Sequence, residues 1–140
     1  MKTLLITKAV VETLAGVAFA ALPSTFIYLL LGQSLDEPEA VAGVRMFGVA
    51  AFAIGLACWL ARNDSSSPAA RALTIALLFY DLAIITILLS ARFEVGLSGL
   101  LLWPVVAIHV ALAAFSVRCL RPGHVDPLST NLPASPSFRA

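Results

Sequence analysis

The sequence predicts an all-α integral membrane protein, an antiparallel bundle of four transmembrane helices. Of its 140 residues, 60% are hydrophobic and 12% are charged, and the mean hydropathy is +0.95. A soluble domain carries about 25% charged residues, so this composition is that of a membrane protein. The apolar residues fall into four runs that approach or exceed the ~20 residues needed to cross the hydrocarbon core. Short polar breaks separate the runs, so neighbouring helices should be antiparallel.

The four predicted transmembrane helices cover residues 4–31, 39–61, 70–91 and 97–120. The breaks between them read "GQSLDEPE", "RNDSSSP" and "RFEVG". The first run is too long for a removable signal peptide and contains Lys8 and Glu12. We therefore assign residues 1–121 to the transmembrane domain. The tail 122–140 has four prolines and few large apolar residues, which predicts a disordered cytoplasmic segment.

Two prolines affect the expected helix geometry. Pro23 removes a backbone hydrogen bond and predicts a kink in the first helix. Pro104 leaves two alternatives: it kinks a helix that begins near Leu97, or it is the first helical residue after Trp103. The second alternative would place His109 closer to the outer surface.

Basic residues predict the orientation in the membrane. They gather at the start of the chain, the middle break and the end of the last helix: Lys2, Lys8, Arg62, Arg71, Arg118 and Arg121. The other two breaks are mainly acidic, with Asp36, Glu37, Glu39 and Glu94 against Arg92. We expect a protein of a bacterial cytoplasmic (inner) membrane, and by the positive-inside rule both termini should lie in the cytoplasm. Cys58 and Cys119 then lie near cytoplasmic helix ends, where thiols stay reduced, and we interpret them as apolar fillers.

Each predicted helix carries one ionisable residue in its middle zone: Glu12, Arg45, Asp81 and His109. Counting 1.5 Å per residue places Asp81 about 18 Å and Arg45 about 21 Å above the cytoplasmic face, with Glu12 and His109 near 12 Å. Intramembrane charges normally face the bundle interior and pair, so these four residues should converge. We expect an Arg45–Asp81 ion pair, and the neighbouring Tyr80 hydroxyl should find a partner inside the bundle.

Helical spacing supports this convergence. Residues at intervals of three and four share one helix face, and on the second helix these are Arg45, Gly48, Ala51, Gly55 and Trp59. On the first helix they are Glu12, Gly16, Phe19 and Pro23. Small residues on such faces let a neighbouring helix backbone come close.

The segment "RMFGVAAFAIGLACWLARN", with an arginine, spaced glycines and a closing W-x-A-R, resembles the second helix of DoxX-like small membrane proteins. The first-helix segment "VVETLAGVAFAALPS" is compatible with that family, and the resemblance covers roughly residues 5–120. It implies a four-helix bundle, and some family members are associated with quinone-linked redox chemistry of sulfur compounds beside a partner protein. No cofactor motif is evident in this chain, so quinone is a candidate through the resemblance alone.

Three function classes stay open. The first is a binding site for a lipophilic small molecule, a quinone or a lipid, formed by Glu12, Arg45, Tyr80, Asp81 and His109. The second is an accessory subunit of a larger membrane complex, in which buried charges only fix the helix register. The third is a membrane-embedded acid–base enzyme, an isomerase or cyclase, with Glu12, Asp81 and His109 as catalytic candidates.

The expected surroundings follow from the same composition. The bilayer, a lipophilic molecule, and a membrane protein partner or second copy are the candidate partners. A net charge of +1 argues against nucleic acid, and the sequence contains no metal-binding motif. The pattern leaves open whether the polar residues form a pocket or a closed ion-pair network.

Overall fold

The computed structural model describes residues 1–121, which form five α-helices and no β-strand. The helices are α1 (Lys2–Ala21), α2 (Pro23–Leu31), α3 (Pro38–Ala61), α4 (Pro68–Phe93) and α5 (Leu102–Leu120). All except α2 are long and apolar enough to cross a membrane. The predicted disordered tail, 122–140, lies outside the described residues.

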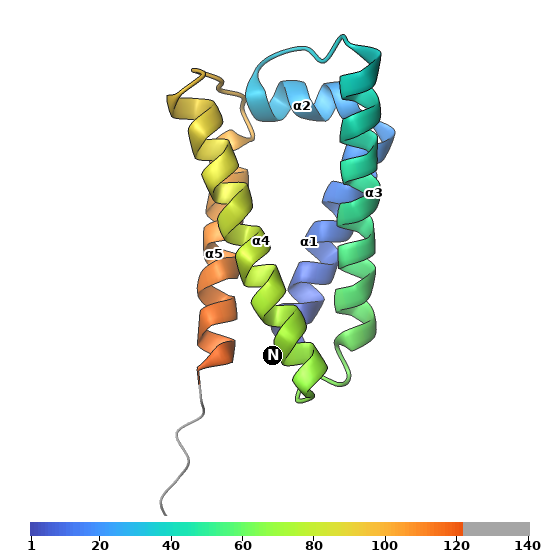
Figure 1. Ribbon diagram of the computed structural model, residues 1–140, viewed down its shortest axis with the longest axis vertical. Coiled ribbons are helices and arrows are strands. Elements are labelled where there is room, and N and C mark those ends of the chain that lie inside the picture. Colours follow the sequence, from blue (N-terminus) through green and yellow to red (C-terminus); the bar gives the residue numbers. More distant parts are fainter. Residues whose placement is uncertain (122–140) are drawn as a thin grey trace, which may run out of the picture.

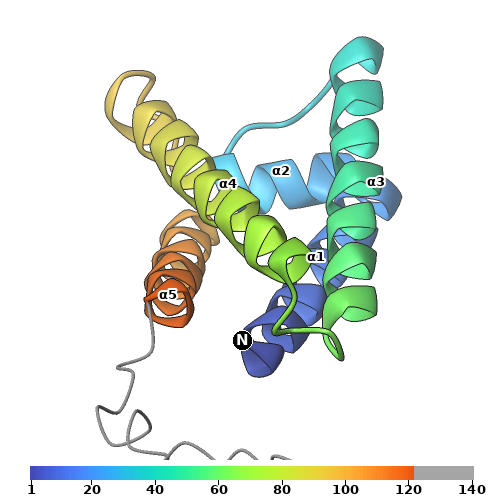
Figure 2. The same ribbon diagram turned by 60° about the horizontal axis from the view of Figure 1, so that its bottom comes forward.

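The four long helices are arranged as two pairs, α1 with α3 and α4 with α5 (Figure 1). Near the chain start, at what we call the closed end, α4 reaches α1 and α3, and toward the opposite end α4 diverges from them and α2 crosses between the pairs (Figures 1 and 2). An apolar cluster joins α1, α3 and α4 at the closed end through Leu5, Ala9, Cys58, Ala70 and Leu77. A second cluster at the α2 end joins α1, α2, α4 and α5 through Phe19, Leu30, Leu88, Leu102 and Val106.

Glycines let α1 and α3 touch backbone to backbone. A Cβ added to Gly16 would lie 2.5 Å from the Phe52 nitrogen, and one added to Gly48 would lie 2.5 Å from the Ala20 nitrogen. No side chain fits into such a gap, so only glycine permits this approach. The predicted small-residue face of the second helix is therefore confirmed for its glycine and alanine positions, Gly48, Ala51 and Gly55, all of which are buried.

The predicted first helix, 4–31, is wrong in one respect, because the chain breaks into two helices instead of kinking. Leu22 leaves the helical conformation, with φ −128° and ψ 55°, and Pro23 begins α2. Proline has no N–H to continue the ladder of α1, but its fixed φ suits a first helical position. The segment after Pro23 consequently crosses the end of the helix pairs instead of continuing along α1. It ends at Gly32, whose φ of 78° is the left-handed conformation that glycine adopts without strain.

The fourth long helix begins at Leu102, five residues later than the predicted start at residue 97. The preceding loop instead pairs with the end of α2: the Ser98 nitrogen donates to the Leu31 oxygen at 3.0 Å, and the Leu101 nitrogen donates to the Leu29 oxygen at 2.8 Å. These bonds satisfy carbonyls that a helix end leaves without partners. Pro104 lies in the first turn of α5, where its missing N–H costs nothing, so it does not kink the helix. The bounds of α3 and α4 fall within two residues of the predicted ranges.

Candidate functional site

Six polar side chains are buried inside the described part of the protein: Lys8, Glu12, Thr74, Asp81, His109 and Ser116. The Thr74 and Ser116 hydroxyls donate to carbonyls one turn earlier in their own helices, at 2.8 Å and 2.9 Å. Those bonds satisfy both hydroxyls locally. The four ionisable groups remain, two from α1 and one each from α4 and α5.

Asp81 lies at the centre of this ionisable cluster and joins the two helix pairs. Its Oδ2 is 2.6 Å from the Lys8 Nζ, and both side chains are fully buried. Its Oδ1 is 3.1 Å from the His109 Nδ1. Because a buried ammonium and a buried carboxylate each need the other, the pair ties α1 of one helix pair to α4 of the other.

The predicted Arg45–Asp81 ion pair is wrong. The Arg45 side chain is exposed on α3, and no ion pair involves it within residues 1–121. The reason is the early end of α1: Gly48 already packs against Ala20, so Arg45, one turn nearer the start of α3, lies beyond the helix that would cover it. The height estimate assumed a first helix that continues past Ala21, so it could not show this end.

Lys8 is the member of the ionisable cluster that sequence reasoning missed. The distribution of basic residues predicts a charge near the cytoplasmic end at this position, whereas the structure buries Lys8 completely. A signal was present in the sequence, because Lys8 and Glu12 are four residues apart and share the buried face of α1.

Glu12 has one carboxylate oxygen paired and one unpaired. The Tyr80 hydroxyl donates to Glu12 Oε2 at 3.2 Å, which is the partner expected for Tyr80 inside the bundle. Glu12 is only 2% exposed, yet no donor in the described chain reaches its Oε1. Buried carboxylate oxygens are normally hydrogen-bonded, so this atom calls for an explanation. The Tyr80 and His109 rings meet edge to face with centroids 5.9 Å apart, which places both beside Glu12.

A cleft of about 630 Å³ opens between the two helix pairs and reaches the ionisable cluster. Residues from all five helices line it, and most are apolar, including Phe19, Phe26, Val44, Ile84 and Val105. Its polar lining comes from Glu12, Tyr80 and His109. Asp81 lies behind this wall and Arg45 lies outside it, so three of the five predicted binding residues line the cleft.

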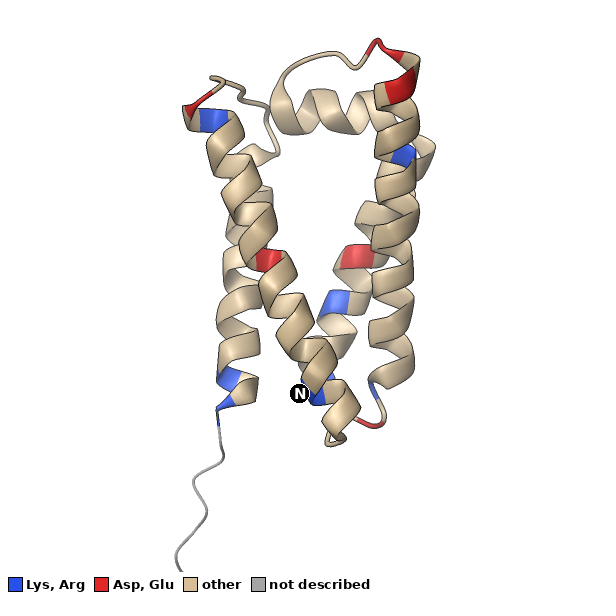
Figure 3. Cartoon of the chain, viewed as in Figure 1, with Lys and Arg blue, Asp and Glu red and all other residues tan. Residues whose placement is uncertain are grey.

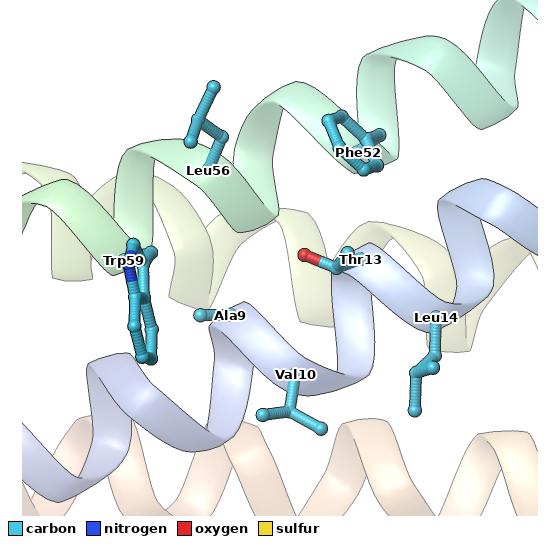
Figure 4. Close-up of a pocket in the computed structure, with 7 residues that line it drawn as sticks. All are labelled: Ala9, Val10, Thr13, Leu14, Phe52, Leu56 and Trp59. Atoms are coloured by element: carbon cyan, nitrogen blue, oxygen red, sulfur yellow. The ribbon is translucent and has the colours of Figure 1, made fainter.

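A second, shallower groove of about 380 Å³ runs between α1 and α3 (Figure 4). Phe52, Leu56 and Trp59 line its α3 side, and Thr13 supplies its polar atom. No charged side chain of the described residues lines this groove. It offers a ligand mainly apolar contact and no charged anchor.

Donor atoms of Glu12, Asp81 and His109 lie within 4.8 Å of one another, close enough to hold a metal ion. Both Asp81 oxygens, however, already have protein partners, one of them the Lys8 ammonium. An ion bound there would have to displace that positive charge or lie beside it. The donor set therefore fits a hydrogen-bonded ionic network better than a metal centre.

Comparisons with known proteins assign no family: no family model matches the chain, and neither a curated protein nor a solved structure is significantly similar to it. The resemblance to DoxX-like proteins stays a prediction.

Proposed function

We propose that this chain is an integral membrane protein whose interhelical cleft binds a lipophilic small molecule, a quinone or a lipid-like compound. The observation that carries the proposal is the combination of an apolar cleft with a buried polar wall, because binding sites for small molecules are mostly apolar with a few placed polar groups. The volume of about 630 Å³ falls in the usual range for such sites. The ligand's tail would contact the apolar helices, and its head would lie at Glu12, Tyr80 and His109.

Ligand-induced stabilisation of the purified protein tests the proposal. A molecule that binds only the folded state stabilises it by about 2.7 kcal/mol at a concentration 100 times its Kd. We expect fractions of a lipid or quinone extract to raise the melting temperature in detergent. The absence of a shift with every fraction would favour the accessory-subunit alternative.

Gly43 offers a variant that fills the cleft. It lines the cleft, and a Cβ added there would meet no atom of the described chain within 4 Å, so Gly43→Leu should occupy ligand space without disturbing the fold. Ala42→Leu is the matched control, because Ala42 is the exposed neighbour and does not line the cleft. We expect the ligand-induced shift to disappear in Gly43→Leu and to persist in Ala42→Leu.

A second candidate, an acid–base enzyme, is favoured by the hydrogen bond between Asp81 and His109. A carboxylate that orients one imidazole nitrogen leaves the other free to exchange a proton with a molecule in the cleft. His109→Gln separates the two functions. If the protein only binds its ligand, the variant should lose affinity for that ligand. If the protein is an enzyme, the variant should retain a bound substrate, which mass spectrometry would find chemically unchanged.

A further inference from the structure

The three polar side chains that line the cleft, Glu12, Tyr80 and His109, can all accept a hydrogen bond from a ligand. Asp81 is paired with the Lys8 ammonium, so it is ionised and accepts at both oxygens. When the His109 ring is neutral, Nδ1 is the donor in the 3.1 Å bond to Asp81, and Nε2 is left as an acceptor. The Tyr80 hydroxyl donates its single hydrogen to Glu12 Oε2, and the lone pairs on its oxygen can still accept a hydrogen bond. Glu12 Oε1 is buried and receives no donor from the described residues.

With both carboxyl groups ionised and the His109 ring neutral, the same groups carry an unbalanced charge. Lys8 supplies one positive charge, while Asp81 and Glu12 supply two negative charges. The ammonium contacts Asp81 at 2.6 Å, and Glu12 forms no ion pair with any described residue. A buried carboxylate without a counter-charge is costly, because it has lost its hydration and gained nothing equivalent.

We propose that the ligand of the cleft is a lipophilic primary amine, bound in its ammonium form with one N–H on Glu12 Oε1 and another on His109 Nε2. This inference rests on the proposed binding function and names its substrate class. An ammonium supplies three donors to a wall of acceptors and one positive charge to an unbalanced cluster. Simple alkylamines resemble the lysine side chain, whose ordinary pKa near 10.4 keeps the group protonated at neutral pH.

Three probes with the same isoprenoid tail isolate the head group: farnesylamine, farnesol and farnesyl methyl ether. The amine is a charged donor, the alcohol a neutral donor, and the ether only an acceptor. Binding is measured in phosphatidylcholine nanodiscs at pH 7. The signal from nanodiscs that carry the Gly43→Leu variant, whose cleft is filled, is subtracted to remove simple partition of the probe into the bilayer. A hydrogen bond to a charged group corresponds to about tenfold in affinity or more, so the amine should bind at least tenfold more tightly than the ether.

Glu12→Gln is the matched variant, since it keeps the size and the acceptor for Tyr80 but removes the charge. The amine preference should collapse to near unity, while ether affinity stays as in the wild type. Because the wild-type series is informative alone, the test does not depend on this variant folding. Replacing half of the phosphatidylcholine by phosphatidylethanolamine, whose headgroup carries a primary ammonium, identifies the source of the ligand's ammonium. If phosphatidylethanolamine weakens the binding of farnesylamine, the ammonium is that of a lipid headgroup. If the binding of farnesylamine is unchanged, the ammonium is that of a free amine.

The outcomes separate this inference from the proposed function. An alcohol or ether that binds as tightly as the amine overturns the ammonium site while leaving the cleft a binding site. The same holds if no farnesyl probe binds but a quinone or lipid fraction stabilises the protein. If no probe and no fraction binds, the proposed function itself fails.

Discussion

The partners of Asp81 explain how an aspartate is tolerated within the otherwise apolar helix α4. Its two oxygens contact the Lys8 ammonium and the His109 ring, so its charge is matched on one side and hydrogen-bonded on the other. Each partner comes from a different helix, α1 and α5, while Asp81 itself belongs to α4. The residue thus connects three helices through one carboxylate, and its removal should loosen all three.

Asp81→Asn should lower the free energy of unfolding in detergent by about 3–5 kcal/mol, because Lys8 would stay buried without its counter-charge. Arg45→Leu is the control: its side chain is exposed, so its effect should stay within about 0.5 kcal/mol. The double change Lys8→Met with Asp81→Leu should destabilise less than the sum of the two single changes. Additive single effects would show that Lys8 and Asp81 are not paired.

Tyr80 is expected to matter through its hydroxyl alone. Tyr80→Phe leaves both Glu12 oxygens without a donor, and an unsatisfied buried acceptor costs about 1–3 kcal/mol. Tyr28 is exposed, so Tyr28→Phe should leave the melting temperature unchanged. Equal melting temperatures for the two variants would mean that the Tyr80–Glu12 bond contributes nothing to stability.

At the scale of single residues, the sequence predicted that Glu12, Arg45, Asp81 and His109 converge, and the structure brings together all of them except the exposed Arg45. That prediction rested on the cost of charge in hydrocarbon, which favours burial and pairing of such groups inside the bundle. The choice of partner was not predictable in the same way. It depends on which helix covers Arg45, and therefore on where α1 ends.

The contact between α1 and α3 depends on glycine at named positions. Gly48→Ala should destabilise the protein by about 1–3 kcal/mol, because the added methyl would overlap the backbone at Ala20. Gly43→Ala, five residues earlier in α3, should be neutral or stabilise by up to about 1 kcal/mol through helix propensity. Chemical unfolding of both variants checks this contrast, and an equal loss at the two positions would contradict the packing described above.

At the scale of elements, apolar run length predicted α3 and α4 well, since polar segments bound both of them. The first and last runs were predicted less well, because apolar residues continue through the breaks at Leu22 and before Leu102. A hydropathy profile does not show where the chain changes direction when the residues at the turn are themselves apolar. Proline marked both places, but only the surrounding packing decides whether proline bends a helix or begins a new one.

At the scale of the whole molecule, charge and shape are arranged along the same axis. The helix pairs close at the end where the chain begins and open toward α2 (Figure 1). Lys and Arg gather mostly at the closed end, and most Asp and Glu lie at the α2 end or in the interior (Figure 3). If the closed end faces the cytoplasm, the cleft opens within the outer half of the bilayer, where a lipophile would enter sideways from lipid.

Cysteine labelling in intact cells tests that orientation. In a protein with Cys58→Ala and Cys119→Ser, a single cysteine at Ser66 reports the 62–67 loop, and one at Glu94 reports the opposite end; both positions are exposed. Because basic residues flank the closed end, the positive-inside rule predicts that an impermeant maleimide labels the Glu94 position from outside and reaches Ser66 only after the membrane is opened. Labelling of Ser66 from outside would invert the orientation and place the cleft mouth in the cytoplasmic half of the bilayer, so its ligand would have to be supplied from the cytoplasmic leaflet.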